Sequence, residues 1–203
     1  LQYAPERLTE IPGIGKKRAA MMAESFASQS QMREAMVMLQ SFELSPAMAM
    51  KIFNYYKEST QEVLRRTPYR LVEDIDGLGV RTADRIAAAQ GMSPGDPARL
   101  RAGMHYILSD AAASGGHTYL PREILIAQAA RLLSAPAEAV ETALEAAVLS
   151  HNLVAREVDD HVAVYMPRAF QAESETARRL LELLEALPYR PDPALAGRIA
   201  KWE

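Results

Sequence analysis

The sequence predicts a mainly α-helical protein with one small β-hairpin. Two similar runs, at residues 11–19 and 75–83, each contain Gly-x-Gly with an apolar central residue and a trailing alanine. Short stretches of helical periodicity surround both runs, and two alternating stretches near residues 153–165 are typical of paired strands. Because a unit that recurs after tens of residues indicates a duplicated structural element, we expect tandem helical repeats first and a mixed unit after them.

The two glycine runs predict tight turns between helices. They read Ile11-Pro-Gly-Ile-Gly-Lys-Lys-Arg-Ala19 and Ile75-Asp-Gly-Leu-Gly-Val-Arg-Thr-Ala83. We expect the glycines to take backbone angles closed to other residues and a new helix to begin directly after them. Its first turn offers unpaired N–H groups and the positive end of the helix dipole, which favour a phosphate. This is the pattern of a helix-hairpin-helix, a motif that holds nucleic-acid backbone without reading sequence.

A degenerate third copy is expected between the two runs. In Phe42-Glu-Leu-Ser-Pro-Ala-Met-Ala49, Glu43 and Ser45 stand where the glycines would be. We expect the turn to fold, with Ser45 as N-cap and Pro46 at the first helical position. Because Glu43 adds a negative charge, this copy is predicted to be structural and not to hold a phosphate.

Residues 1–97 are predicted to form the tandem helix-hairpin-helix region, which ends in the loop of residues 91–97. Helical spacing places helices at residues 19–26, 32–39, 47–56, 60–65, 69–74 and 82–90. Seven of the ten methionines lie between Met21 and Met50, and we expect them to fill gaps in the core.

Residues 98–167 are predicted to form a winged-helix-like unit. Its expected elements are helix 98–113, strand 117–120, helices 121–133 and 136–150, and strands 153–158 and 161–165. In a winged helix that reads DNA, the second helix of the pair enters the major groove. Here that helix carries Glu138, Glu141 and Glu145 and no Lys or Arg. We therefore expect DNA to repel it, and we interpret the unit as a spacer or a protein-contact surface.

Residues 168–203 predict an amphipathic helix and a linker. One face of the helix expected at residues 168–187 carries five apolar residues: Ala177, Leu180, Leu181, Leu184 and Leu187. We expect this face to pack on the winged-helix-like unit, on a domain outside this chain, or on both. Three prolines follow, and residues 194–203 would form a last helix carrying Trp202.

Composition limits the possible functions. The 203 residues include no cysteine, which rules out disulfides and thiolate metal sites and fits a cytoplasmic location. The net charge is −3: residues 1–97 have 12 basic against 12 acidic residues, residues 98–167 have 5 against 8, and residues 168–203 have 6 against 6. No segment is strongly basic, so we expect DNA binding to be weak and sensitive to salt.

The sequence contains no motif for catalysis. The Gly-x-x-x-x-Gly-Lys-[Ser/Thr] phosphate loop is absent, and the four histidines lack the spacing of metal ligands. No apolar stretch has the length of a membrane span. We therefore expect no catalytic residue, metal, cofactor or membrane partner here. Because the sequence begins inside a repeat, we expect it to be a piece of a longer protein.

Several further motifs complete the pattern. They are Leu39-Gln-Ser-Phe-Glu-Leu-Ser-Pro-Ala47, Thr67-Pro-Tyr-Arg-Leu71, Gly77-Leu-Gly-Val-Arg-Thr-Ala-Asp-Arg-Ile86, Arg99-Leu-Arg-Ala-Gly103 and Tyr119-Leu-Pro-Arg-Glu123. With the two glycine runs, they make the chain, up to about Leu187, resemble the amino-terminal region of RecD-like DNA helicases. The resemblance is to the RecD/TraA type with a long N-terminal extension.

This resemblance implies a helicase of DNA repair or recombination that moves 5′ to 3′ on single-stranded DNA and uses ATP and Mg²⁺. Its motor domains would follow Glu203, and this chain would be a non-catalytic accessory region that contacts DNA and those motor domains. Carried over by motif, backbone N–H groups would hold phosphates, with Arg18 and Thr82 adding side-chain donors. The residues with these N–H groups are Gly13, Gly15, Lys16, Lys17, Gly77, Gly79, Val80 and Arg81.

Two other interpretations stay open. In one, the chain is a protein-interaction scaffold that keeps the hairpins as architecture and contacts the motor or a partner. In the other, it belongs to a nuclease or another DNA-repair enzyme with the same hairpins, although such proteins lack the motifs at residues 67–71 and 119–123. The scaffold is distinguished by whether Lys16, Lys17 and Arg81 matter for DNA affinity.

Overall fold

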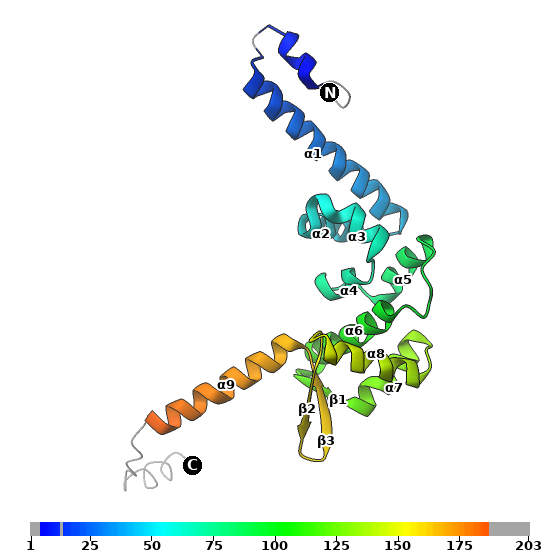
Figure 1. Ribbon diagram of the computed structural model, residues 1–203, viewed down its shortest axis with the longest axis vertical. Coiled ribbons are helices and arrows are strands. Elements are labelled where there is room, and N and C mark those ends of the chain that lie inside the picture. Colours follow the sequence, from blue (N-terminus) through cyan, green and yellow to red (C-terminus); the bar gives the residue numbers. More distant parts are fainter. Residues whose placement is uncertain (1–4, 13, 187–203) are drawn as a thin grey trace, which may run out of the picture.

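The computed structural model describes residues 5–12 and 14–186. It is mainly helical with one small antiparallel sheet, as the sequence predicted. Figure 1 shows an elongated molecule in which two long helices, α1 (Lys16–Ser41) and α9 (Pro167–Ala186), project from a central body of shorter helices.

The first part of the chain consists of helices joined by tight turns. Besides α1, its elements are η1 (Pro5–Glu10), α2 (Pro46–Tyr56), η2 (Lys57–Ser59), α3 (Thr60–Arg66), α4 (Arg70–Asp74) and α5 (Val80–Ala89). Helices α2 to α5 agree with the predicted ones to within two residues at each end. Ser45 is the N-cap of α2 and Pro46 its first residue, so the predicted start of the degenerate copy is confirmed.

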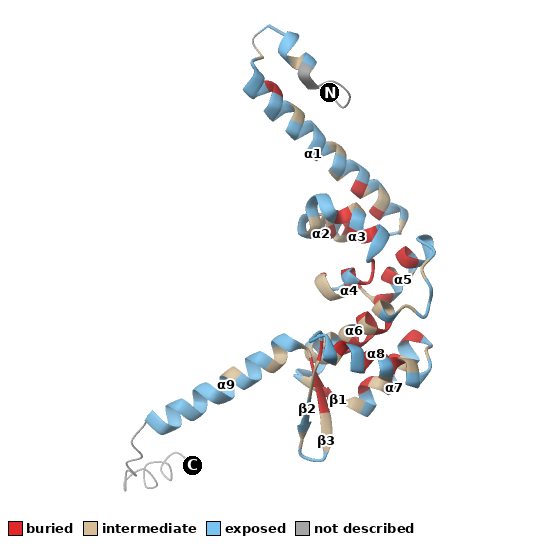
Figure 2. Ribbon diagram, viewed as in Figure 1, coloured by how far each residue is buried: buried red, intermediate tan, exposed pale blue. Residues whose placement is uncertain are grey.

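Helix α1 is continuous, although the sequence predicted two helices in its place. The segment between them contains no glycine or proline, so nothing in the chain ends the helix there. Only Ala19, Ala35 and Leu39 are buried along α1. Met21 and Met22 are 62% and 41% exposed, and the expectation that they fill the core is wrong. Only η1 packs against the first half of α1 in the described structure, and Figure 2 shows most of this half exposed.

The second part of the chain combines three helices with three strands. Its elements are α6 (Pro97–Gly115), β1 (Tyr119–Pro121), α7 (Arg122–Leu133), α8 (Ala137–Leu149), β2 (Val154–Val158) and β3 (His161–Tyr165). The strands form an antiparallel sheet in the order β1-β3-β2, with Leu120 opposite Val164 and Val164 opposite Ala155. This order of elements is compatible with the expected winged-helix-like unit.

Strand β1 begins two residues later than predicted because of how α6 ends. The helix continues to Gly115, and Gly116 terminates it in the left-handed conformation, with φ of +67°. The N–H of His117 then donates to the carbonyl oxygen of Ala111 at 3.3 Å, which closes the last turn of the helix. His117 therefore belongs to the helix end and not to the strand.

Helix α6 joins the two parts of the molecule. It packs against α4 and α5 on one side and against α7 and α8 on the other. A Cβ atom added at Gly103 would lie 2.6 Å from Cδ1 of Leu133, so the close approach of α6 and α7 requires glycine at this position. The buried side chains form one connected cluster from Leu39 to Val164. The division at residue 97 therefore crosses a shared core, and the domain boundaries stay a prediction.

Helix α9 leaves the body after its first turns. Glu173 accepts hydrogen bonds from the hydroxyls of Thr118, at 2.6 Å, and Tyr165, at 3.4 Å. Farther along, Leu180 and Leu184 are 57% and 70% exposed, and the outer part of the helix is bare in Figure 2. Within the described residues, the expected packing of this face on the winged-helix-like unit is therefore wrong. Leu187 and the last helix predicted at residues 194–203, with Trp202, lie outside the described residues.

Candidate nucleic-acid interface

Helices α1, α2 and α5 begin in the same way. Their N-cap residues have extended backbone, with φ and ψ of −80° and 167° at Gly15, −61° and 150° at Ser45, and −84° and 158° at Gly79. Four residues on, a buried alanine donates its N–H to the N-cap carbonyl oxygen at 2.9, 2.9 and 3.4 Å; the alanines are Ala19, Ala49 and Ala83. The repeat in the sequence is therefore a repeat of structure, and the degenerate copy folds like the other two.

In the turn at residues 75–83 and in the degenerate copy, one described residue has the conformation that favours glycine. Gly77 has φ of +87°, and Glu43 occupies the corresponding place in the degenerate copy with φ of +58°. Gly15 and Gly79 have ordinary φ values, so the expectation that they take angles closed to other residues is wrong. The physical reason is that an N-cap residue is extended, a conformation open to any residue, as Ser45 demonstrates. Gly13 lies outside the described residues.

The space outside the two glycine N-caps is open. A Cβ atom added at Gly15 would meet nothing within 4 Å. One added at Gly79 would meet a single neighbour, Cε2 of Tyr106, at an ordinary contact distance of 3.9 Å. Neither glycine is therefore required by the packing of the protein itself. Their lack of a side chain instead leaves the helix ends accessible from outside.

The starts of α1, α2 and α5 differ in whether a side chain of the protein accepts one of their N–H groups. In α2 the Oγ of Ser45 accepts the N–H of Met48 at 3.2 Å. Helices α1 and α5 have glycine N-caps and no side-chain cap. At the start of α5, Thr82 donates to the carbonyl oxygen of Gly79 at 3.1 Å. The N–H groups of Val80 and Arg81 have no acceptor in the described part of the chain, as expected for an uncapped helix.

The first turn of α1 is both uncapped and positively charged. Lys16, Lys17 and Arg18 are exposed, and the first turn contains no acidic residue. Their N–H groups find no acceptor within residues 5–12 and 14–186. Positive side chains beside free N–H groups and the positive end of a long helix make this a place where an anion is stabilised.

The second glycine turn, at residues 75–83 and called the second turn below, has Arg81 as its exposed cation. A further cation lies against it that the sequence did not indicate. The Nζ of Lys51, on α2, donates to the carbonyl oxygen of Asp76 at 2.6 Å. The degenerate copy thus places a positive charge against the second turn, although its own end is capped by Ser45. Lys51 could have been singled out in the sequence because it is the one Lys or Arg within α2. Glu43 is ion-paired with Arg85 of α5.

The structure does not bring the two predicted turns together. Helix α1 has 26 residues, which corresponds to about 39 Å at 1.5 Å per residue. In Figure 1 its first turn lies at one end of the molecule, whereas α5 lies beyond its other end. A single phosphate group cannot contact both turns. The two are separate sites that would meet different parts of a DNA strand.

A half-buried polar network fixes α5 to its neighbours. Asp84 on α5 accepts hydrogen bonds from Nε and Nη2 of Arg99, at 2.7 and 2.9 Å, and from the hydroxyl of Tyr69, at 3.1 Å. Nη1 of Arg99 also donates to the carbonyl oxygen of Leu133 at 3.0 Å, at the end of α7. Burial and the nearby Asp84 carboxylate raise the pKa of Tyr69 to about 12. The network holds the start of α5 in one orientation relative to the core.

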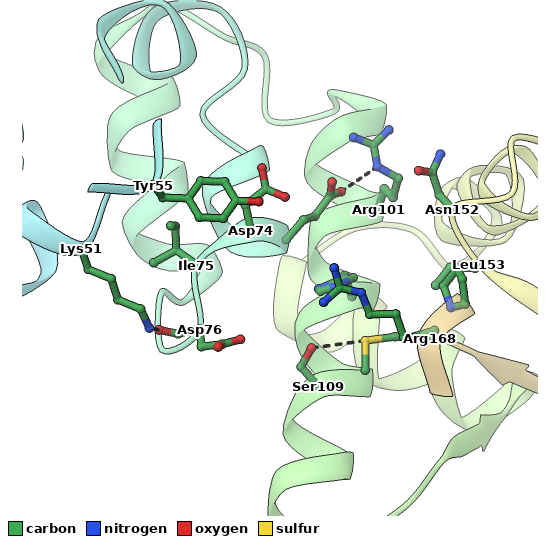
Figure 3. Close-up of a pocket in the computed structure, with 14 residues that line it drawn as sticks. Lys51, Tyr55, Asp74, Ile75, Asp76, Arg101, Ser109, Asn152, Leu153 and Arg168 are labelled. Carbon is green, nitrogen blue, oxygen red and sulfur yellow. Dashed lines mark hydrogen bonds and ion pairs between the residues drawn. The ribbon is translucent and has the colours of Figure 1, made fainter. Parts of the chain in front are cut away.

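A polar cleft separates the second turn from the sheet (Figure 3). It has a volume of about 670 Å³, and its charged lining is balanced between Lys51, Arg101 and Arg168 and Glu73, Asp74 and Asp76. Arg101 donates to Glu73 across 2.7 Å, which neutralises both groups. A cleft with as many carboxylates as cations does not favour a phosphate over water.

His105 lies in the same cleft. Its Nδ1 is buried without a hydrogen-bond partner in the described structure, and burial lowers the pKa of its imidazole. No group of three or more His, Cys, Asp or Glu is placed to hold a metal ion in the part of the chain that the structure describes.

The acidic helix of the winged-helix-like unit is partly neutralised. Nη2 of Arg122, on α7, lies 2.8 Å from Glu141 and 3.4 Å from Glu145. Glu138 is exposed at the first turn of α8. The helix stays net negative, and its role as a spacer or protein-contact surface stays a prediction. Among the described helices, none is both long and apolar enough to cross a membrane.

Comparisons with known proteins also find helix-hairpin-helix families that match this chain. Residues 28–119 match the family described as the ATP-dependent RecD2 DNA helicase HHH domain, and residues 1–28 match the SAM-like helix-hairpin-helix tandem. Over 197 residues the chain is 29% identical to the ATP-dependent RecD2 DNA helicase of Deinococcus radiodurans. That alignment covers 93% of this chain and 27% of the relative. Residues 28–119 therefore match the helix-hairpin-helix domain described for RecD2 helicases, and the predicted resemblance to RecD-like helicases is confirmed.

Proposed function

We propose that this chain, with its RecD2-type helix-hairpin-helix domain, is a non-catalytic accessory region of an ATP-dependent DNA helicase and binds DNA through backbone phosphates. The Deinococcus relative is named as such a helicase, and this chain spans about 27% of that relative's length. Motor activity, with its ATP and Mg²⁺, is proposed for the full-length protein. Its direction of movement and its part in DNA repair or recombination are proposed in the same way.

The observation that carries the proposal is the contrast between the three helix starts. Helices α1 and α5 begin at glycines, have no side-chain cap and carry cations in the first turn, whereas Ser45 satisfies the start of α2. An N–H group at a helix end is best satisfied by an anion, and a phosphate oxygen accepts such bonds strongly. Two of the three starts are therefore suited to a phosphate.

The predicted site residues act together in this proposal. The N–H groups of Lys16 and Lys17 and those of Val80 and Arg81 donate to phosphate oxygens. Positively charged side chains beside them add attraction that depends on salt. A side chain at Gly79 would occupy the space from which the phosphate approaches. Because only phosphate and sugar are contacted, binding at these turns carries no sequence preference.

The affinity of the chain is expected to be modest. Each turn holds one or two phosphates, and residues 1–97 have no excess of positive charge. For about three phosphates in total, the logarithm of the binding constant falls with the logarithm of salt concentration with a slope of about −2.7 on duplex DNA. The chain therefore serves to position DNA near a motor that supplies the rest of the affinity.

A protein-interaction scaffold is the second candidate, and a specific observation favours it. Leu180, Leu181 and Leu184 are more than half exposed on the outer part of α9. A row of exposed leucines on one helix is typical of a surface that contacts another protein. Contact with the helicase's own motor domains is compatible with DNA binding at the turns, so the two functions are not exclusive.

The proposal is tested by fluorescence anisotropy with single-stranded, duplex and forked DNA at about 20 mM and about 150 mM salt. The variant Lys16→Glu/Lys17→Glu is compared with Arg33→Glu/Arg65→Glu, which makes the same change in net charge at exposed positions away from the turns. We expect weaker binding and a smaller salt slope in the first variant only. Equal losses in both variants would mean that overall charge, and not the first turn, controls binding.

A further inference from the structure

A hollow lies on the far side of α6 from the polar cleft, between α6 and α7. Its volume is about 310 Å³, within the range of small-ligand sites. Its apolar lining includes Ile107, Leu120 and Leu132, and Leu132 is 38% exposed. In Figure 1, α6 lies between α5 and α7, so the second turn and the hollow are neighbours across one helix.

Tyr106 joins the hollow to the second turn. It lines the hollow, and its Cε2 atom would lie 3.9 Å from a Cβ atom at Gly79, the N-cap of α5. The residue is 36% exposed, and its hydroxyl has no hydrogen bond within the described residues. An accessible aromatic ring thus has one edge beside the N-cap of α5, and the same side chain borders an apolar cavity.

The charge of the hollow separates it from the phosphate position. Asp110 contributes a carboxylate to its lining, and no lysine or arginine lines it among the described residues. A phosphate is therefore favoured at the start of α5, beside Arg81, and disfavoured inside the hollow. An uncharged, flat and partly apolar group suits the hollow instead. His117 and Gln128 supply donors and acceptors at its edge.

We infer that the hollow receives an unpaired nucleobase, which stacks on Tyr106 while the start of α5 holds a phosphate of the same strand. This inference rests on the proposed function and adds that the second turn prefers single-stranded or frayed DNA. In a duplex the faces of the bases are covered by their neighbours, so a base reaches the ring only when its strand is unpaired. Stacking on an aromatic ring accepts every base, and the preference is for strand state and not for sequence.

The test compares Tyr106→Ala and Tyr106→Phe with the wild-type chain on a single-stranded oligonucleotide and on a duplex of the same sequence. Loss of one stacking partner lowers affinity by about 5-fold to 150-fold, the range that corresponds to stacking on one aromatic ring. We expect this loss for Tyr106→Ala on the single strand only, and single-strand affinity close to wild type for Tyr106→Phe. A 2-aminopurine base in the single strand reports stacking directly, since its fluorescence falls when it stacks.

Three results would overturn the inference. They are an unchanged single-strand affinity in Tyr106→Ala, an equal loss on single strand and duplex, and the same 2-aminopurine quenching with and without the ring. Thermal melting of each variant checks that the fold is kept, and Tyr106→Phe provides a comparison with the ring retained. Arg81→Glu separates the two proposals. If it leaves binding to both DNAs unchanged, the phosphate position itself is wrong; if it weakens binding and Tyr106→Ala does not, only the nucleobase site is wrong.

Discussion

The substitution Gly79→Ser should stabilise the protein and weaken its binding to DNA. The N-cap backbone of Gly79, with φ and ψ of −84° and 158°, is close to that of Ser45, which already caps α2. A serine at residue 79 therefore reproduces the N-cap of the degenerate copy. Its Oγ accepts an N–H of the first turn of α5, and its Cβ enters a space whose nearest atom, on Tyr106, is 3.9 Å away.

The expected gain in stability is about 1 kcal/mol. A serine cap is better than a glycine cap by a few tenths of a kcal/mol, and replacing glycine at an unstrained position adds about 0.4–1 kcal/mol through the unfolded state. For a chain of 203 residues, this raises the melting temperature by about 2–4 °C. Gly77→Ala, at φ of +87°, should instead lower stability by about 1–2 kcal/mol, because alanine is strained there.

The expected loss in DNA affinity is about tenfold or more. A hydrogen bond to a charged partner is worth about 1.5–3 kcal/mol, and the Oγ of the new serine competes with the phosphate for one such N–H group. Melting curves and anisotropy titrations on one preparation give both quantities. A variant that melts higher and binds DNA as tightly as the wild type would refute the assignment of a phosphate to the start of α5. Ser45→Gly is the matched control, and its DNA affinity should stay unchanged.

Three further predictions concern the second turn and the core beside it. Arg81→Glu should reduce the magnitude of the salt slope by about 0.9 on duplex DNA for each phosphate that is no longer neutralised, measured by anisotropy at several salt concentrations. Arg99→Ala should destabilise the protein by about 3–5 kcal/mol in urea unfolding, because it removes the positively charged partner of the half-buried Asp84 carboxylate. A decrease below about 1 kcal/mol would contradict the structural role of this pair. Burial lowers the pKa of His105 from 6.5, so the unfolded chain takes up the proton first and the free energy of unfolding should fall as the pH drops below 6.5. His105→Gln should flatten this part of the pH profile measured by urea unfolding, and an unchanged profile would contradict the prediction.

The turns were predictable because their construction is local. An N-cap, a trailing alanine and a proline at the first helical position are fixed by contacts within about four residues, so Ser45, Pro46 and Ala49 were recognisable in the sequence. The same holds for the strand turn at Asp159, whose φ is +51°. The glycines were harder to interpret, because the residue type alone does not distinguish a positive φ, as at Gly77, from an extended N-cap, as at Gly79.

Contacts between distant segments were not predictable. Most of the first half of α1 is exposed, so the helical spacing of its apolar residues there does not mark a packed face. The hydrogen bond from Lys51 to the carbonyl of Asp76 joins segments 25 residues apart. Asp84 and Arg99 belong to two separate motifs in the sequence, and only the folded chain places them together in a half-buried pair. These contacts are the ones that orient the second turn.

The most direct test of phosphate binding at the glycine-capped turns is an amide NMR titration. The ¹⁵N-labelled chain is titrated with a short single-stranded oligonucleotide at low salt, and the backbone amide resonances at the three helix starts are followed. We predict that the amides of Lys16 and Lys17 and those of Val80 and Arg81 shift and saturate. The amide of Met48, already bonded to Ser45, should stay in place. Shifts at Met48 as large as those at Val80, or no shift at either glycine-capped turn, would contradict the account.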